Sequence, residues 1–148
     1  MSILICYDGS PNAKHAISVA AATLRGEGAI LLHIYNPPVA FLADSFGDPG
    51  LSGPTLDELE RLSLERAHQI AHEGEELARA DGLSVTVRVE RAGKGVWHTI
   101  LDVAETVDAQ LIVVGTRGHT ALESSLLGSV SATIVHNSVR PLLIVPAV

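Results

Sequence analysis

The stretch ILICYDGSP, residues 3–11, joins a short apolar run to a sequence that can start a helix. The run from Ile3 to Tyr7 is continuous and partly β-branched, which is typical of a strand buried on both faces of a sheet. After Asp8-Gly9, the pair Ser10-Pro11 has the residue types of a helix N-cap and the first helical position. A buried strand that leads directly into a helix predicts an α/β fold.

The rest of the chain repeats this alternation of short apolar runs with longer segments of helical spacing. We expect further strands at 30–35, 84–90, 111–114 and 141–145, and helices at 14–24, 56–80, 96–107 and 129–136. Strands separated by helices need right-handed crossovers, which produce a parallel sheet covered on both faces. We therefore expect one doubly wound α/β domain over residues 1–148, with a long surface loop at 36–54.

Local signals support two of these elements in particular. Thr55 and Glu58 have the spacing of a capping box, which predicts the start of the long helix at 56–80. In the segment 84–90, valines alternate with polar residues, which predicts a half-exposed strand at an edge of the sheet.

Composition excludes several classes of protein. With 148 residues, 47% of them hydrophobic, the chain has enough apolar material for the core of one domain. Ten basic against 17 acidic residues give a net charge of −7, and aromatic residues make up only 3%. Nucleic-acid binders usually carry a basic surface and aromatic stacking platforms, so we expect no nucleic-acid partner.

The cellular setting follows from cysteine usage and hydropathy. Cys6 is the single cysteine, so no intrachain disulfide can form, which fits a reducing cytoplasm. The N-terminus has no basic region of a signal peptide, and the weakly polar stretch 16–24 is too short to span a bilayer. We therefore expect a cytoplasmic protein without a membrane partner.

The strongest candidate site follows the strand at 111–114. Gly115 and Gly118 remove side chains where a ligand would approach the backbone, and Gly128-Ser129 stands where the last helix begins. The free amides at a helix start, with the positive end of its dipole, favour an anion such as a polyphosphate. Glycines and serines at these positions also serve as ordinary turns and caps, so the spacing decides between the two readings.

This spacing, Gly-x2-Gly-x9-Gly-Ser after a buried strand, resembles the ATP-binding signature of the universal stress protein family. Asp8-Gly9-Ser10 and the closing RPLLIV at 140–145 resemble that family too, so the resemblance covers nearly the whole chain. It implies a Rossmann-like, five-stranded parallel sheet in the order 3-2-1-4-5. It also implies a homodimer formed through the last strand and ATP held between the ends of the first and fourth strands.

The resemblance further implies a role for individual residues. Asp8 would meet the adenine or ribose, Ile34 would pack on the adenine, and Val114 with Gly115 would line the ribose. Arg117 would pair with a phosphate or point to solvent. The phosphates would be held by Gly118, Gly128, Ser129, Val130 and Ser131, and the hydroxyls of Ser129 and Ser131 could add donors. The family often has proline or valine where this chain has Cys6.

Binding is favoured over catalysis at this site. The segment 115–131 contains no lysine, no pair of acidic residues and no evident general base, which phosphoryl transfer requires. We expect a nucleotide-dependent stress-response regulator that binds ATP, with Mg2+ carried mainly by the phosphates. Two alternatives stay open: a slow ATP hydrolase or autophosphorylating enzyme, and an interaction protein with an empty site.

Other motifs carry less weight. A P-loop needs a glycine where Arg88 stands, and a dinucleotide fingerprint would need one in place of Leu31. His68 and His72 have a spacing that can bind zinc, but further ligands are missing, so we expect two exposed histidines. Cys6 is expected in the core rather than as a reactive thiol. An exposed charged face is expected on the long helix, at Glu60, Arg61, Glu65 and Arg66.

Overall fold

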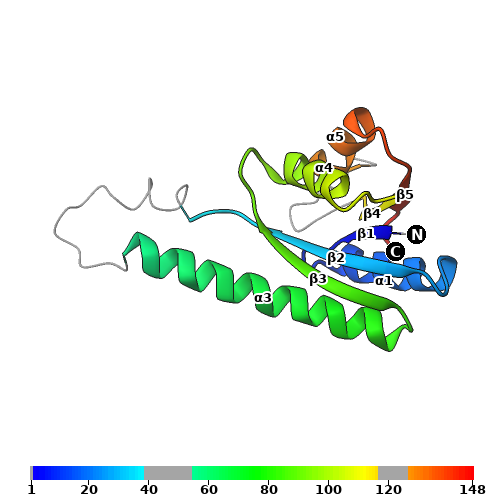
Figure 1. Ribbon diagram of the computed structural model, residues 1–148, viewed down its shortest axis with the longest axis horizontal. Helices are drawn as coiled ribbons and strands as arrows, with labels where there is room; N and C mark the ends of the chain where they lie inside the picture. The colour runs from blue at the N-terminus through cyan, green and yellow to red at the C-terminus, as the bar shows by residue number, and fades with distance from the viewer. Residues whose placement is uncertain (1, 39–54, 117–126) are drawn as a thin grey trace.

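A computed structural model describes residues 2–38, 55–116 and 127–148, and strands alternate with helices along the described chain (Figure 1). The predicted strands and helices are all present, with ends that shift by up to three residues. In chain order the elements are β1 (Ser2–Cys6), α1 (Pro11–Thr23), β2 (Gly28–Tyr35), α3 (Leu56–Ala80), β3 (Ser84–Arg91), α4 (Val96–Thr106), β4 (Leu111–Gly115), α5 (Ser129–Asn137) and β5 (Leu142–Val145).

The strands form one five-stranded sheet in the order β3-β2-β1-β4-β5. Every neighbouring pair is parallel, so the predicted fold class and strand order are confirmed. From β1 the chain first adds β2 and β3 on one side, and it then crosses over to add β4 and β5 on the other. The strand order therefore reverses between β1 and β4, where ligands bind in folds of this type.

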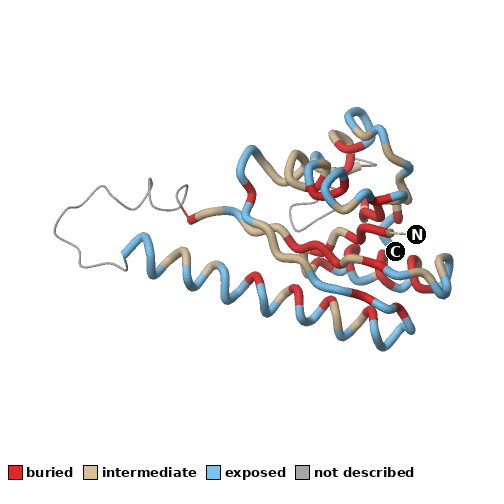
Figure 2. Tube along the Cα trace, viewed as in Figure 1, coloured by how far each residue is buried: buried red, intermediate tan, exposed pale blue. Residues whose placement is uncertain are grey.

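Helices cover both faces of the sheet, with α1 and α3 on one face and α4 and α5 on the other (Figure 1). Side chains alternate along a strand, so Ile3 and Ile5 pack with α1 and α3, whereas Leu4 packs with α4 and α5. All three side chains are fully buried. The buried residues gather along the central strands, and the outer surface of α3 is exposed (Figure 2).

The predicted helix starts are confirmed. Ser10 is the N-cap of α1, its side chain accepts a hydrogen bond from the Ala13 amide, and Pro11 is the first helical residue. At α3, Thr55 and Glu58 form both bonds of the capping box. Such bonds satisfy amides that have no partner within the helix.

The expected charged face of α3 needs one correction. Arg61 and Glu65 are exposed and pair with each other at 2.9 Å, as an exposed face predicts. Glu60 instead accepts a hydrogen bond from Arg91 at 2.8 Å and one from the Tyr35 hydroxyl at 3.4 Å. Because α3 packs against β2 and β3, the half-buried Glu60 pairs with residues at the ends of those strands while keeping part of its surface in solvent.

Helix α3 approaches the sheet closely at Gly74. A Cβ at this position would lie 2.6 and 2.9 Å from two ring carbons of Tyr7 and 3.0 Å from Leu31 Cδ2. The Tyr7 ring cannot move away freely, since its hydroxyl donates to Glu73 Oε1 at 2.5 Å. The buried face of α3 is accordingly made of small residues: Ala67, Ala71, Gly74 and Ala78.

We predict that Gly74→Ala destabilises the protein even though alanine favours helices. The propensity gain is about 1 kcal/mol, whereas overpacking costs about 1–3 kcal/mol. Because the Tyr7 ring is held in place, we expect a cost of overpacking near the upper end of this range. The free energy of unfolding, measured by urea denaturation, should therefore fall by about 1–2 kcal/mol. Gly93→Ala is the control, because nothing lies within 4 Å of its Cβ position; equal stability of the two variants would contradict the prediction.

Candidate functional site

The candidate site lies at the carboxyl edge of the sheet, where β1 and β4 end side by side. Ile5 of β1 is paired with Val113 of β4, so continuing this register brings Tyr7 level with Gly115. Asp8 therefore follows β1 at the point where the chain leaves β4. The sequence placed Asp8 and Gly115 in one site, and the structure brings their two segments together.

Three apolar residues of the predicted nucleoside wall belong to one face of the sheet. Cys6 is paired with Leu32, Ile34 lies two residues further along β2, and Val114 lies one residue beyond the Ile5–Val113 pair. Val114 is buried and packs in the cluster under α4 and α5, and Cys6 and Ile34 pack against that cluster while partly buried. Cys6 and Ile34, which are only partly buried, form the apolar surface of this cluster near the carboxyl edge.

The thiol of Cys6 is kept protonated by its surroundings. Burial raises the pKa of Cys6 to about 12, and the negative charge of Asp8 adds to this effect. A nucleophilic cysteine needs a lowered pKa, so this finding agrees with the prediction of a core role.

The turn after β1 holds Asp8 in a defined position. The Ser10 amide donates to Asp8 Oδ1 at 2.9 Å, and Gly9 has a positive φ of 81°, which a glycine adopts without strain. Ahead of Asp8, the Tyr7 amide donates to the Leu32 carbonyl at 2.9 Å, and His33 Nδ1 lies 2.8 Å from the Tyr7 carbonyl oxygen. The backbone on both sides of Asp8 is thus fixed.

Tyr7 is anchored by a polar contact that the sequence analysis missed. Its hydroxyl donates to Glu73, and Lys14 Nζ lies 2.9 Å from the same carboxylate oxygen. Burial, and then this hydrogen bond, raise the pKa of Tyr7, whereas the Tyr7 hydroxyl, and then Lys14, lower the pKa of Glu73. The contact links β1 to α1 and α3 immediately before Asp8.

The two ends of the segment between β4 and α5 are joined by hydrogen bonds. The Gly128 amide donates to the Thr116 carbonyl, and the Ser131 hydroxyl donates to the Gly115 carbonyl at 2.6 Å. The sequence predicts this hydroxyl as a possible donor to a ligand, whereas in the structure it donates to the protein. The bond fixes the first turn of α5 against the end of β4.

The N-terminus of α5 has the features of an anion site. The first bond within the helix runs from the Ala132 amide to the Gly128 carbonyl at 2.9 Å, so the amides of Ser129, Val130 and Ser131 have no acceptor further back in the helix. The N-cap is Gly128, which provides no capping side chain, and the first turn contains no acidic residue. These amides and the helix dipole favour negative charge in front of the helix.

A second residue that the sequence analysis missed is Asn12. This side chain is 7% exposed, and it accepts a hydrogen bond from Thr116 Oγ1 at 3.2 Å. A Cβ on Gly115 would lie 2.9 Å from Asn12 Cγ and Oδ1, so the glycine is needed for this packing. No local sequence pattern distinguishes this asparagine from one exposed in a first helical turn.

A family model, the universal stress protein family, matches residues 1–146. The chain belongs to this family. It is 38% identical over 146 residues to the Thermus aquaticus protein called universal stress protein in QAH/OAS sulfhydrylase 3′ region, and the match covers 97% of each chain.

Solved structures of the family share the fold of this universal stress protein. That of a universal stress protein in complex with cAMP has a TM-score of 0.66 and 23% identity, and the match covers 99% of this chain and 96% of that one. The Archaeoglobus fulgidus universal stress protein in complex with dAMP has a TM-score of 0.69 and 22% identity, with 98% and 97% covered.

Two predicted site residues of this universal stress protein, Arg117 and Gly118, lie outside the described residues, as does most of the segment 36–54.

Among the described residues, no cluster of three or more histidine, cysteine or acidic side chains could hold a metal ion. His68 and His72 are exposed as predicted, and His72 lies near Glu75 and Glu76. In the described ranges, no helix combines the length and apolar character needed to cross a bilayer.

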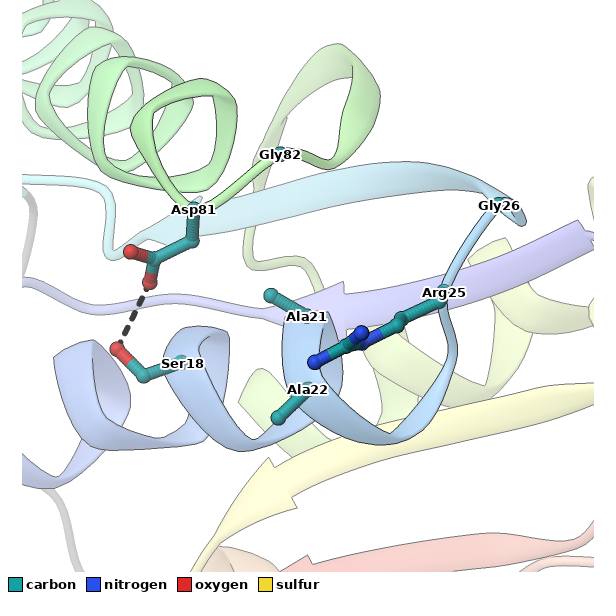
Figure 3. Close-up of a pocket in the computed structure, with 7 residues that line it drawn as sticks. All are labelled: Ser18, Ala21, Ala22, Arg25, Gly26, Asp81 and Gly82. Atoms are coloured by element: carbon teal, nitrogen blue, oxygen red, sulfur yellow. Dashed lines mark hydrogen bonds between the residues drawn. The ribbon is translucent and has the colours of Figure 1, made fainter.

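A separate hollow of about 510 Å³ lies away from the candidate site, at the C-terminal ends of α1 and α3 (Figure 3). Its lining includes Arg25 and also Asp81, which accepts a hydrogen bond from Ser18 at 2.8 Å. Helix C-termini carry partial negative charge, so this end of the helices lacks the electrostatics of a phosphate site.

We predict that Glu73→Gln lowers stability at neutral pH and loses its effect in acid. The pKa of Glu73 is lower in the folded protein, so its ionised form stabilises the fold above the pKa of a free glutamate, about 4.3. This contribution disappears as the pH falls through the lowered folded value. Urea denaturation of both proteins should show a difference at neutral pH that shrinks below about pH 4, whereas a constant difference would contradict this account.

Proposed function

We propose that this universal stress protein binds ATP at the carboxyl ends of β1 and β4 and acts as a nucleotide-dependent regulator of the stress response. The observation that carries the proposal is the start of α5, where three backbone amides follow a glycine N-cap that is bonded to Thr116, just beyond the end of β4. The cAMP and dAMP complexes of two structural neighbours support an adenine nucleotide as the ligand.

In the proposed complex, the nucleoside lies on the apolar surface and the phosphates lie in front of α5. Asp8 binds the ribose or adenine, Ile34 packs on the adenine, and Val114 with Gly115 borders the ribose. The remaining proposed contacts are with the phosphates, through Arg117, Gly118, Gly128, Ser129, Val130 and Ser131. Mg2+ would be held mainly by the phosphate oxygens, which is consistent with the chemistry that hard cations prefer.

The expected affinity is micromolar. Hydrogen bonds to charged groups contribute about 1.5–3 kcal/mol each. Their sum must exceed the free-energy cost of the translational and rotational entropy lost on association. A net value of about −8 kcal/mol corresponds to a dissociation constant near 1 μM. This range suits a protein that responds to nucleotide concentration.

We propose binding without efficient hydrolysis. Asp8 is the acidic side chain that follows β1, and in the proposed complex it lies at the nucleoside end, far from the terminal phosphate. Phosphoryl transfer needs a positioned nucleophile and stabilisation of developing charge near that phosphate. A turnover of about 1 per second or more would favour the hydrolase alternative instead.

We propose that the protein acts as a homodimer formed along β5, and that it works in the cytoplasm, where ATP and reduced thiols are available. Strand β5 is an edge of the sheet, and its residues Leu142, Leu143 and Ile144 are only partly buried. In the segment that precedes β5, Val135 is 43% and Val139 is 97% exposed. An unpaired edge with apolar neighbours is a suitable surface for a second copy.

The site is tested by placing an acidic side chain at the exposed start of α5. Ser129→Asp should keep or slightly raise stability, by up to about 1 kcal/mol, because acids are favourable at helix N-termini. The same charge should repel the phosphates and weaken ATP binding at least about tenfold, measured by calorimetry. Asn137→Asp at the other end of α5 is the control; equal ATP affinity of both variants would refute the proposed site.

The dimer is tested at the exposed Val139. Val139→Asp should weaken dimerisation at least about tenfold, since an interface that buries a charge without a partner loses well over 1 kcal/mol. Sedimentation equilibrium measures the change, and Leu62→Asp on α3, also an exposed apolar residue, is the control. A wild-type protein that stays monomeric, or two variants that dimerise equally, would exclude β5 as the interface.

A further inference from the structure

Thr116 is the residue at which the elements around the candidate site meet. Its amide donates to the Val145 carbonyl at the end of β5, with a distance of 3.0 Å, and its own carbonyl accepts from the Gly128 amide. Its hydroxyl donates to Asn12 in the first turn of α1 at 3.2 Å. One residue thus connects β4 to β5, to α5 and to α1.

Asn12 completes a closed ring of hydrogen bonds with Thr116. Asn12 Nδ2 donates to the Val145 carbonyl oxygen at 3.2 Å, and this oxygen is the same acceptor that the Thr116 amide uses. Asn12 is 7% exposed, Thr116 8% and Val145 1%, so water has little access to the ring. Buried hydrogen bonds that share groups in this way strengthen one another, because each polarises the next.

The ring lies between the proposed phosphate site at the start of α5 and the proposed dimer interface along β5. On one side, Gly128 begins the turn of α5 whose amides face the proposed phosphates. On the other side, Val145 is the last residue of β5, the proposed dimer edge. Two bonds, from the Gly128 amide to the Thr116 carbonyl and from the Thr116 amide to the Val145 carbonyl, therefore connect the start of α5 to the end of β5.

We infer that Asn12 and Thr116 are positioning residues that hold the start of α5 in place for the phosphates and couple ATP binding to dimer formation through Val145. This inference rests on the proposed function. Coupling between two binding equilibria is reciprocal, so ATP should strengthen the dimer by the same factor by which the dimer strengthens ATP binding.

The experiment compares wild-type protein with Thr116→Val. This substitution keeps the shape of the side chain but removes the hydroxyl that donates a hydrogen bond to Asn12. The dimer dissociation constant is measured by sedimentation with and without ATP, and ATP affinity by calorimetry. Thr116→Ser restores the hydroxyl and serves as the rescue. Thr106→Val on α4 is the matched control, because it loses only a bond from Thr106 Oγ1 to the Asp102 carbonyl within that helix.

In wild-type protein, we expect ATP to change the dimer dissociation constant about fivefold or more. In Thr116→Val, the change in the dimer dissociation constant caused by ATP should fall toward a factor of one. ATP affinity should fall about three- to tenfold, which is the usual effect of one lost buried hydrogen bond. Thr116→Ser should recover most of both effects, and Thr106→Val should behave as wild type. A merely structural role would alter stability but leave the ATP-dependent factor unchanged.

The possible failures are distinguishable. Suppose that wild-type protein binds ATP and dimerises, but ATP changes the dimer dissociation constant of Thr116→Val by the same factor as in wild type. The inference is then overturned and the proposed function stands. If ATP does not alter the wild-type dimer at all, the coupling is likewise overturned. If wild-type protein binds no ATP, the proposed function and this inference are both refuted.

Discussion

Burial of the sheet on both faces determines where this protein can bind a polar ligand. Ile3, Leu4 and Ile5 of the central strand are fully buried, with α1 and α3 on one side and α4 and α5 on the other. A charged ligand cannot reach either face without displacing a helix. A polar ligand therefore has to approach at an end of the strands.

The parallel topology then gives the two ends opposite electrostatic character. Each crossover helix begins near the carboxyl edge and runs back to the amino edge, so the helix N-termini gather at the carboxyl edge. At this edge α1 is capped by the Ser10 side chain, whereas α5 begins at Gly128 with no side-chain cap. The hollow at the other end, beside Asp81, faces helix C-termini. Topology and capping together favour one end for an anion.

The sequence predicts those parts of the structure that depend on neighbouring residues. The helix starts at Ser10-Pro11 and Thr55–Glu58 are local signals, and both were correct. The glycines at 115 and 128 located the candidate site because each stands at the end or start of a regular element. The strand order came from the family resemblance rather than from periodicity, since the pattern alone does not say which strands are neighbours.

The sequence could not predict the contacts that join distant segments at the site. Tyr7 and Glu73 are 66 residues apart, and Asn12 is separated from Thr116 by 104 residues and from Val145 by 133. Such pairs depend on how the helices pack on the sheet. The same packing explains why the Ser131 hydroxyl binds the Gly115 carbonyl, although its position at the start of a helix suggested a donor to a ligand.

Phosphate binding at the start of α5 is measured most directly by an NMR titration of 15N-labelled protein with ATP and Mg2+. We expect the largest amide shifts at Ser129, Val130 and Ser131, with smaller shifts around Asp8 and Ile34. Amides near Arg25 and Gly82, beside the separate hollow, should stay unchanged. Shifts that gather around Arg25, or no saturable shifts at the start of α5, would contradict the claim that this helix end binds the phosphates.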